Sequence, residues 1–200
     1  MTDAIYQSGF NTSTHFPEEP NNILGTTSCD FHSGGSYADI FFAIGECSLG
    51  SILVAQSLRG VCSILIGEDP ALLAQELQVR LPEANLISNE NNELVAKVAG
   101  LVEKPGSGFD LPLDIRGTVF QQRVWQALLQ IPPGSTATYT DIANKIGTPG
   151  AVRAVAQACA ANALAVVIPC HRVIKTDGSL SGYRWGVERK RALLEREAHA

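Results

Sequence analysis

Glycine and proline repeatedly interrupt the second part of this chain, and this punctuation limits it to short helices joined by tight turns. Pro132, Pro133 and Gly134 end one amphipathic segment, and Gly147 closes the next. The pattern predicts three helices, at 119–130, 139–146 and 151–161, with Thr138 as the N-cap of the second. A short helix, a tight turn and an Ala-rich helix in this order are typical of a helix-turn-helix.

The last of these helices, at 151–161, has two different faces. One face is apolar and is expected to pack in the core, whereas the opposite face is free to contact DNA. The apolar set is Val152, Val155 and Cys159, and the opposite set is Arg153, Gln157 and Ala160.

The part before this region has strand patterns as well as helical ones. Apolar runs at 37–44, 51–56 and 61–66, with Gly60 at a turn, predict an antiparallel meander. Helices are expected at 70–81, after an Asp69 cap, and at 93–103. Alternation at 111–115 predicts a short edge strand. The chain is therefore expected to be α+β, with a disordered arm at 1–36, an α+β domain at 37–113 and a helical domain at 114–200.

The charge of the chain is distributed unevenly. The net charge is −5, but residues 1–114 carry 4 Lys and Arg against 15 Asp and Glu, whereas residues 115–200 carry 11 against 5. This asymmetry suggests that the second part meets a polyanion such as DNA. An ordinary difference in composition between two domains is the alternative.

The remaining composition excludes several classes of protein. The longest strongly apolar run, at 163–168, is far shorter than the roughly 18 residues of a membrane-spanning helix. The N-terminus has no basic start followed by an apolar stretch, so a cytoplasmic protein without membrane contact is expected. Five cysteines, none in a C-x-x-C pair, argue against a disulfide framework or a zinc site of four cysteines.

Cys170 is the cysteine with the strongest signal for chemistry. It follows an apolar run and Pro169, which restricts the backbone that presents the thiol. His171 and Arg172 add positive potential, which is expected to lower the pKa of the thiol from its usual value of about 8.5. Buried packing is the alternative, because free cysteines beside apolar strands are mostly inert.

Several segments together resemble a known family. FQQRVWQALLQIPPGSTATYTDIA, RAVAQACAAN, IPCHRV and SGYRWGVERKRALLERE are similar to the O6-alkylguanine-DNA alkyltransferases, and the likeness covers roughly residues 37–197. The resemblance implies a ribonuclease-H-like α/β domain followed by a helical, winged-helix-like domain that contains the helix-turn-helix. It also implies a monomer without cofactor or metal, acting on double-stranded DNA that contains O6-alkylguanine and transferring the alkyl group irreversibly to the protein.

The resemblance assigns the reaction to five residues. Cys170 is the alkyl acceptor and His171 is the base, which acts on the thiol through a bridging water. Glu197 orients the histidine, although the sequence alone favours a solvated residue in the last helical turn. Asn162 braces the turn between the Ala-rich helix and the cysteine. Tyr139 turns the phosphate of the target nucleotide and donates to the base, whereas the bare sequence is equally compatible with a core aromatic.

Further residues are implied in DNA binding and in a guanine pocket. Arg153 would fill the gap left by an extruded guanine, the alternative being an ordinary phosphate contact or surface residue. Small or polar neighbours would lie against the minor groove, and the pocket would hold the base by backbone groups. The DNA set is Arg153, Tyr139, Ala151, Ala154 and Gln157; the pocket set is Val173, Ser181, Gly182, Tyr183, Arg184 and Trp185. A large Trp185 beside the pocket would exclude benzyl but not methyl groups, unless it packs only on the helix that follows.

Two other functions remain open at this point. A Cys-His hydrolase would need a histidine far from the cysteine in sequence, and His171 is adjacent to Cys170. A DNA-binding module without transfer activity would not require the thiol. Labelled O6-methylguanine DNA separates these functions from alkyl transfer.

Overall fold

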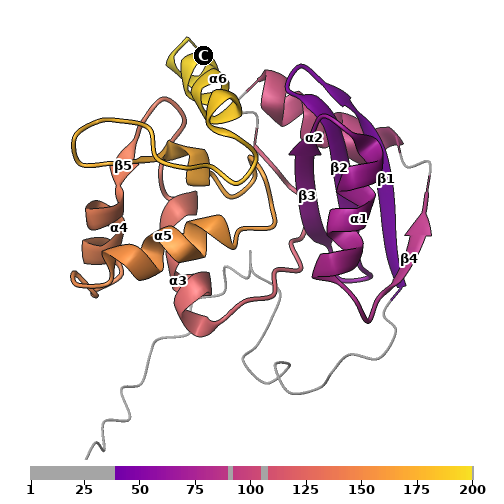
Figure 1. The fold of residues 1–200 in the computed structure, drawn as a ribbon, viewed down its shortest axis with the longest axis horizontal. Coiled ribbons are helices and arrows are strands. Elements are labelled where there is room, and N and C mark those ends of the chain that lie inside the picture. Colours follow the sequence, from indigo (N-terminus) through magenta and orange to yellow (C-terminus); the bar gives the residue numbers. More distant parts are fainter. Residues whose placement is uncertain (1–38, 90–91, 105–107, 200) are drawn as a thin grey trace, which may run out of the picture.

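The computed structural model describes residues 39–89, 92–104 and 108–199. The arm expected at 1–36 lies outside the described residues. The predicted α+β class is confirmed, while the domain boundary at 113 stays a prediction. For convenience we call residues 39–113 the sheet half and residues 114–199 the helical half (Figure 1).

The sheet half contains four strands in the order β3-β2-β1-β4. The first three are β1 (Asp39–Cys47), β2 (Gly50–Gln56) and β3 (Val61–Gly67), and they pair antiparallel as the predicted meander. The fourth, β4 (Asn85–Ser88), pairs parallel to β1 and was not predicted.

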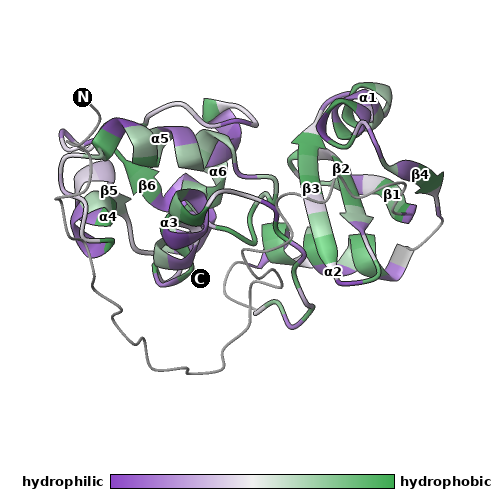
Figure 2. Cartoon of the chain, turned by 90° about the horizontal axis from the view of Figure 1, so that it is seen from below, coloured by the Kyte–Doolittle hydropathy of each residue, from purple (hydrophilic) through white to green (hydrophobic). Residues whose placement is uncertain are grey.

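Two helices cover the opposite faces of this sheet, α1 (Pro70–Arg80) and α2 (Asn92–Glu103) (Figures 1 and 2). Side chains of β2 alternate between the faces, because successive residues of a strand point to opposite sides. Leu53 packs in a small cluster with Leu73 and Leu77 of α1, whereas Val54 belongs to the larger core that includes Val98 of α2. Asp69 caps α1 as predicted, accepting a hydrogen bond from the Ala71 amide.

The edge strand predicted at 111–115 is wrong, because only one isolated bridge forms there, between Leu113 and Val61. The side chain of Asp114 turns inward and accepts a hydrogen bond from the Ser57 hydroxyl at 2.7 Å. Gly60 allows the backbone at Pro112 to pass close to it, because a Cβ at position 60 would lie 2.2 Å from the carbonyl oxygen of Pro112.

The helical half follows the predicted order of helices. It contains α3 (Val119–Leu129), β5 (Ala137–Thr138), α4 (Tyr139–Lys145), α5 (Val152–Ala160), the 3-10 turn η2 (Cys170–Arg172), β6 (Val173–Ile174) and α6 (Val187–Ala198). Thr138 caps α4 through a reciprocal capping box with Asp141, and Thr118 caps α3 in the same way with Gln121. The indole of Trp125 fixes α3 against α5 by donating to the Ala158 carbonyl at 2.9 Å.

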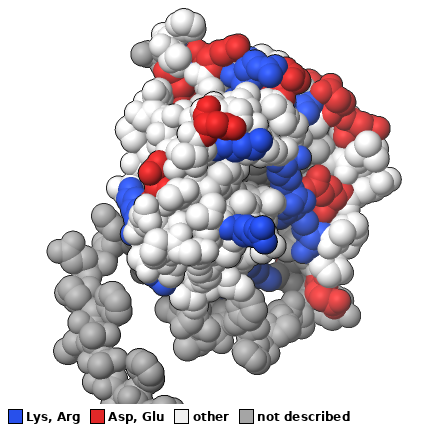
Figure 3. Space-filling model, turned by 60° about the vertical axis from the view of Figure 1, so that its left-hand side comes forward, with Lys and Arg blue, Asp and Glu red and all other residues white. Residues whose placement is uncertain are grey.

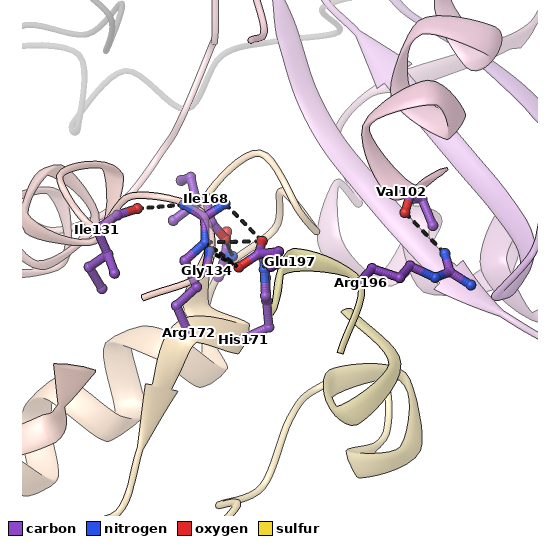
Figure 4. Close-up of polar contacts among 9 residues, drawn as sticks. Val102, Ile131, Gly134, Ile168, His171, Arg172, Arg196 and Glu197 are labelled. Atoms are coloured by element: carbon purple, nitrogen blue, oxygen red, sulfur yellow. Dashed lines mark hydrogen bonds and ion pairs between the residues drawn. The ribbon is translucent and has the colours of Figure 1, made fainter. Parts of the chain in front are cut away.

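The two halves share one continuous core and meet along β3. The Ile64 amide donates to the Ala163 carbonyl at 2.8 Å, and the Ala165 amide donates back to Ile64 at 3.1 Å. On the other side, Arg196 of α6 donates to the Val102 carbonyl at 3.0 Å (Figure 4). The segment that leads to Cys170 is therefore anchored to the edge of the sheet.

Within these described ranges, no helix has the length and apolar character needed to cross a membrane.

Candidate active site

Cys170 begins the η2 turn and is almost completely buried, with 4% of its surface exposed. The loop before it contains Val166 at φ 66°, a left-handed conformation that β-branched residues rarely adopt. Because Ala165 is held by β3, the loop keeps this conformation while it leads the chain into the cysteine.

Asn162 braces the turn around Cys170, as the resemblance implies. Its side-chain amide lies 3.2 Å from the Cys170 sulfur and also donates to the carbonyls of Leu164 and Ile168. Its carbonyl oxygen accepts from the Leu164 amide at 2.9 Å. Asn162 is fully buried, so these contacts replace the hydrogen bonds it would make to water.

His171 and Glu197 form a buried pair, with 2.8 Å between Nε2 and Oε1 (Figure 4). Burial alone would raise the pKa of Glu197, but hydrogen bonds from His171 and Arg172 bring it down to about 2. The carboxylate is therefore ionised and can only accept, so the Nε2 atom carries the proton. The Nδ1 atom of His171 is buried, has no hydrogen-bond partner in the structure and is left as an acceptor.

Arg172 is directed toward Glu197 of this pair rather than toward the Cys170 thiol. Its Nε lies 3.1 and 3.0 Å from the two carboxylate oxygens of Glu197, and its other end donates to the Ile131 carbonyl (Figure 4). The Gly134 amide adds a longer contact of 3.4 Å to the same carboxylate. The position of Glu197 is thus fixed from η2 and from the segment after α3.

The prediction that His171 and Arg172 lower the pKa of Cys170 is wrong. Burial raises the pKa of this thiol to about 11, while the hydrogen bond from Asn162 and the charge of Lys190 partly oppose that rise. Burial also lowers the pKa of His171, although the hydrogen bond to Glu197 works against this shift. At neutral pH the site therefore holds a protonated thiol and a neutral imidazole.

Lys190 is the polar residue that the sequence did not single out. It lies on α6, is completely buried, and donates from Nζ to the Val173 carbonyl at 2.6 Å and to the Ser181 hydroxyl at 2.9 Å. Lys190, Leu193 and Glu197 are spaced by three and four residues and are all buried. That helical spacing, ending on the expected Glu197, was the available signal.

The residues expected to contact DNA come from the start of α4, from the N-cap of α5 and from α5 itself. Arg153 and Gln157 of α5 are exposed, while Ala151 and Ala154 are half-buried. Tyr139, at the start of α4, is half-buried, and its hydroxyl lies 2.5 Å from that of Ser181. Figure 3 shows one face of the molecule, on which Lys and Arg side chains and some Asp and Glu side chains are spread over a mostly uncharged surface.

The residues expected in the guanine pocket differ in how deeply they are buried. Val173 is buried, and the rings of His171, Tyr183 and Trp185 follow one another edge to face, with centroids 6.4 and 5.1 Å apart. Ser181 is half-buried and Gly182 exposed.

The Arg184 side chain, however, turns toward the sheet half. It pairs with Glu76 of α1 at 2.6 Å and donates to the Ala160 carbonyl at 3.1 Å. Trp185 is buried and packs edge to face against Tyr183.

The fold and this cluster define a class of protein in which a buried cysteine, next in sequence to a buried histidine–glutamate pair, follows a helix-turn-helix. Residues 119–199 match the family model described as 6-O-methylguanine DNA methyltransferase, DNA binding domain. The chain is 38% identical over 150 residues to an inducible methylated-DNA–protein-cysteine methyltransferase of Bacillus subtilis, covering 74% of this chain and 84% of that protein. It therefore belongs to the O6-methylguanine DNA methyltransferase family.

Three further relatives extend the comparison. The Escherichia coli bifunctional transcriptional activator/DNA repair enzyme Ada is 48% identical over 200 residues, which is 99% of this chain. This chain spans 56% of the length of Ada and 57% of that of a Salmonella typhimurium relative. The protein in the crystal structure of Mycobacterium tuberculosis OGT in complex with DNA is 36% identical to this chain in sequence, and the two structures superpose with a TM-score of 0.67. The match covers 80% of this chain and 93% of the OGT chain.

Proposed function

We propose that this protein repairs O6-alkylguanine, and O4-methylthymine as a second substrate, in double-stranded DNA by transferring the alkyl group to the Cys170 sulfur. The observation that carries this proposal is the buried Cys170 beside a histidine whose Nδ1 is an unpartnered acceptor and whose Nε2 is bonded to Glu197. A Bacillus subtilis protein named as an inducible methylated-DNA–protein-cysteine methyltransferase is 38% identical to this chain over 150 aligned residues, which supports the proposal.

The protonation states explain why a base is needed. With a pKa of about 11, the Cys170 thiol carries its proton at neutral pH and is a poor nucleophile. A water between the thiol and the Nδ1 atom of His171 would pass the proton to the imidazole, and the ionised Glu197 would stabilise the imidazolium.

The transfer itself follows simple displacement. The thiolate forms a bond to the alkyl carbon, the bond from that carbon to O6 breaks, and its electron pair stays on guanine, which takes up a proton. The product is a thioether, which water cannot hydrolyse as it hydrolyses a thioester, so each protein molecule reacts once.

The burial of Cys170 also requires the target to come to it. O6 of guanine lies inside the base stack, so the nucleotide must leave the duplex before its alkyl group can reach the sulfur. Arg153 is exposed on α5 and has a long, planar cation that would fill the vacated position. Helix α5 carries small alanines that permit close approach in the minor groove.

A titration with a duplex that contains radiolabelled O6-methylguanine tests the proposal. We expect transfer to stop at one methyl group per protein molecule, with the label on the peptide that contains Cys170. Multiple turnovers would favour a hydrolase, and binding without transfer would favour a lesion sensor. Either result would overturn the proposal.

The aromatic series behind the site sets the alkyl groups that the protein accepts. Trp185 is buried and its ring contacts that of Tyr183. A benzyl group beside Tyr183 would therefore meet a ring that has no free space to move into. We expect Trp185→Gly to improve benzyl transfer relative to methyl transfer by roughly 10-fold or more, since a change in pocket size is worth about 1–3 kcal/mol. The benzyl-to-methyl rate ratio of one preparation cancels any loss of folded protein, and an unchanged ratio would contradict this role.

A further inference from the structure

The loop before α6 ends in a tight turn that carries Trp185. The Tyr183 carbonyl accepts from the Gly186 amide at 3.0 Å, which closes the turn, and Gly186 has φ 101°, a value that glycine adopts readily and other residues rarely do. The Trp185 indole is buried, and its Nε1 finds no hydrogen-bond partner among the described residues. The position of the ring therefore depends on its packing and on the backbone of the turn.

Arg189 of α6 binds the backbone of this turn. Its Nη1 donates to the Trp185 carbonyl at 2.9 Å, and its Nε donates to the Leu49 carbonyl at 2.8 Å. Leu49 belongs to the core and lies between β1 and β2. Because a guanidinium is planar, its donors keep a fixed spacing and direction. One side chain therefore ties the backbone of Trp185 to the sheet half.

The third contact of Arg189 adds less to this bridge. Its Nη2 pairs with Glu68, directly after β3, but the side chain of Glu68 is 86% exposed, whereas that of Arg189 is 17% exposed. An ion pair that is open to water on one side gains little and is screened by salt. The bridge thus depends mainly on the carbonyls of Leu49 and Trp185.

The sheet half holds the neighbouring residue of the turn as well. Arg184 is bound through its side chain to Glu76 of α1, whereas Trp185 is bound through its carbonyl to Arg189. Two adjacent residues of one turn are therefore connected to two different places in the sheet half. The turn cannot carry the Trp185 ring to a new position without losing at least one of these contacts.

We propose that Arg189 is a positioning residue that limits the size of the alkyl group, by holding the Trp185 ring in place from the sheet half. With Arg189 bound, the ring stays against Tyr183 and a benzyl group is excluded. Without Arg189, the turn can shift at Gly186 and move the ring outward, which leaves room for a larger group. This role rests on the proposed function, but the effect of Arg189 on Trp185 is measurable without any transfer.

The first test follows both tryptophans by ¹⁹F NMR in the full chain labelled with 5-fluorotryptophan, with Trp185→Phe to assign the signals. Trp125 and Trp185 are 2% and 4% exposed, so neither signal should differ between H2O and D2O. In Arg189→Met, we expect a solvent isotope shift at Trp185 and none at Trp125, because Arg189 binds only the backbone of Trp185. No shift at Trp185, or equal shifts at both, would overturn the proposal.

Two control variants separate the bridge from a general effect of charge. Arg191→Met removes another arginine of α6, but that side chain is exposed and pairs with Glu188. Glu68→Gln removes the exposed partner of Arg189 and leaves both carbonyl contacts in place. In both variants Trp185 should behave as in the unmodified protein. A response to either that equals the response to Arg189→Met would overturn the bridge.

The second test compares single-turnover transfer from duplexes that contain O6-benzylguanine or O6-methylguanine. We expect Arg189→Met to raise the benzyl-to-methyl rate ratio roughly 3- to 10-fold, the range that corresponds to one lost hydrogen bond. Both rates are measured on one preparation, so a loss of folded protein cancels in the ratio. An unchanged ratio beside normal methyl transfer would overturn the positioning role and leave the proposed function intact.

A double substitution shows whether Arg189 acts through the ring. Trp185→Gly removes the indole but keeps the carbonyl that Arg189 binds. In this background, Arg189→Met should change the rate ratio less than 2-fold, because the ring that it positions is gone. An equal increase in both backgrounds would overturn the positioning role. No transfer by the unmodified protein would overturn the proposed function and leave the ¹⁹F result standing.

Discussion

The sheet half and the helical half contribute to the active site in different ways. The side chains that hydrogen-bond Cys170 and His171 come from the helical half, namely Asn162 and Glu197. The sheet half instead holds main-chain groups: β3 pairs with the loop at Leu164, and Arg80 of α1 reaches the Asn162 carbonyl at 3.4 Å. One half therefore supplies the side chains of the candidate site, while the shape of the site depends on both.

The largest expected effect separates the reactive thiol from the other cysteines. Cys170→Ala should abolish alkyl transfer and leave DNA binding intact, because the buried sulfur offers little contact area to DNA. Labelled transfer and duplex binding are measured on the same preparation. Cys47→Ala and Cys62→Ala in the sheet half serve as controls and should transfer at the normal rate. Transfer by the Cys170→Ala variant would show that Cys170 is not the acceptor of the alkyl group.

Glu197→Gln should reduce the single-turnover rate on the order of 10²- to 10⁴-fold, with the backbone unchanged. The new amide can donate to the Nε2 atom of His171, which moves the imidazole proton to Nδ1 and removes the acceptor that the proposed proton transfer requires. A rate within 3-fold of the unmodified protein would show that the tautomer of His171 does not matter.

Arg153→Ala should slow repair of duplex DNA about 10- to 100-fold, since unstacking one nucleotide costs a few kcal/mol. Reaction with free O6-methylguanine base should be unaffected, because a free base needs no extrusion. Arg191→Ala, which removes another exposed arginine of the helical half, is the matched control. Equal losses on duplex and free base would instead indicate a role inside the site.

The smallest expected effect tests the sheet half. Glu76→Gln removes the partner of Arg184 and Arg80, and it should destabilise the protein by less than about 1 kcal/mol because the pair is partly exposed. Transfer should fall by no more than a few fold. Glu93→Gln, which breaks an exposed pair with Lys97 in the same half, should change neither quantity. A loss as large as that of Glu197→Gln would show that the sheet half takes part in the chemistry.

The sequence predicted the elements whose signals are local. The caps at Asp69 and Thr138, the meander and the helix-turn-helix rest on contacts between near neighbours, and the structure has them. Strand β4 was missed because its four residues form a strand only by pairing with β1. No local sequence pattern indicates that pairing. The strand expected around Leu113 failed for the same reason, since one bridge to Val61 is all that its surroundings offer.

The sequence and the family resemblance indicated which residues lie together in the candidate site, but not its electrostatics. Cys170, His171, Asn162 and Glu197 do lie together in the structure, while their roles in the reaction stay predictions. Neighbours in sequence are a poor guide to charge, however, because Arg172 turns to Glu197 and leaves the thiol to the effect of burial.

Lys190 escaped prediction for a related reason. It stands in a helix rich in charged residues, where a lysine is ordinarily solvated, and only the packing of α6 buries it.

Val166 has a consequence for any attempt to reproduce this site in a smaller molecule. Its left-handed backbone conformation, at φ 66°, costs about 1–2 kcal/mol. Its side chain is nevertheless buried in the core, and glycine, which has no side chain, could not make those contacts. The loop is thus kept in shape by β3 on one side and Asn162 on the other, and not by its own sequence. A synthetic peptide of residues 163–174 would contain IPCHRV in full and still relax to other conformations. A mimic of this site must therefore include the groups of β3 and Asn162 that hold the loop, in addition to the cysteine.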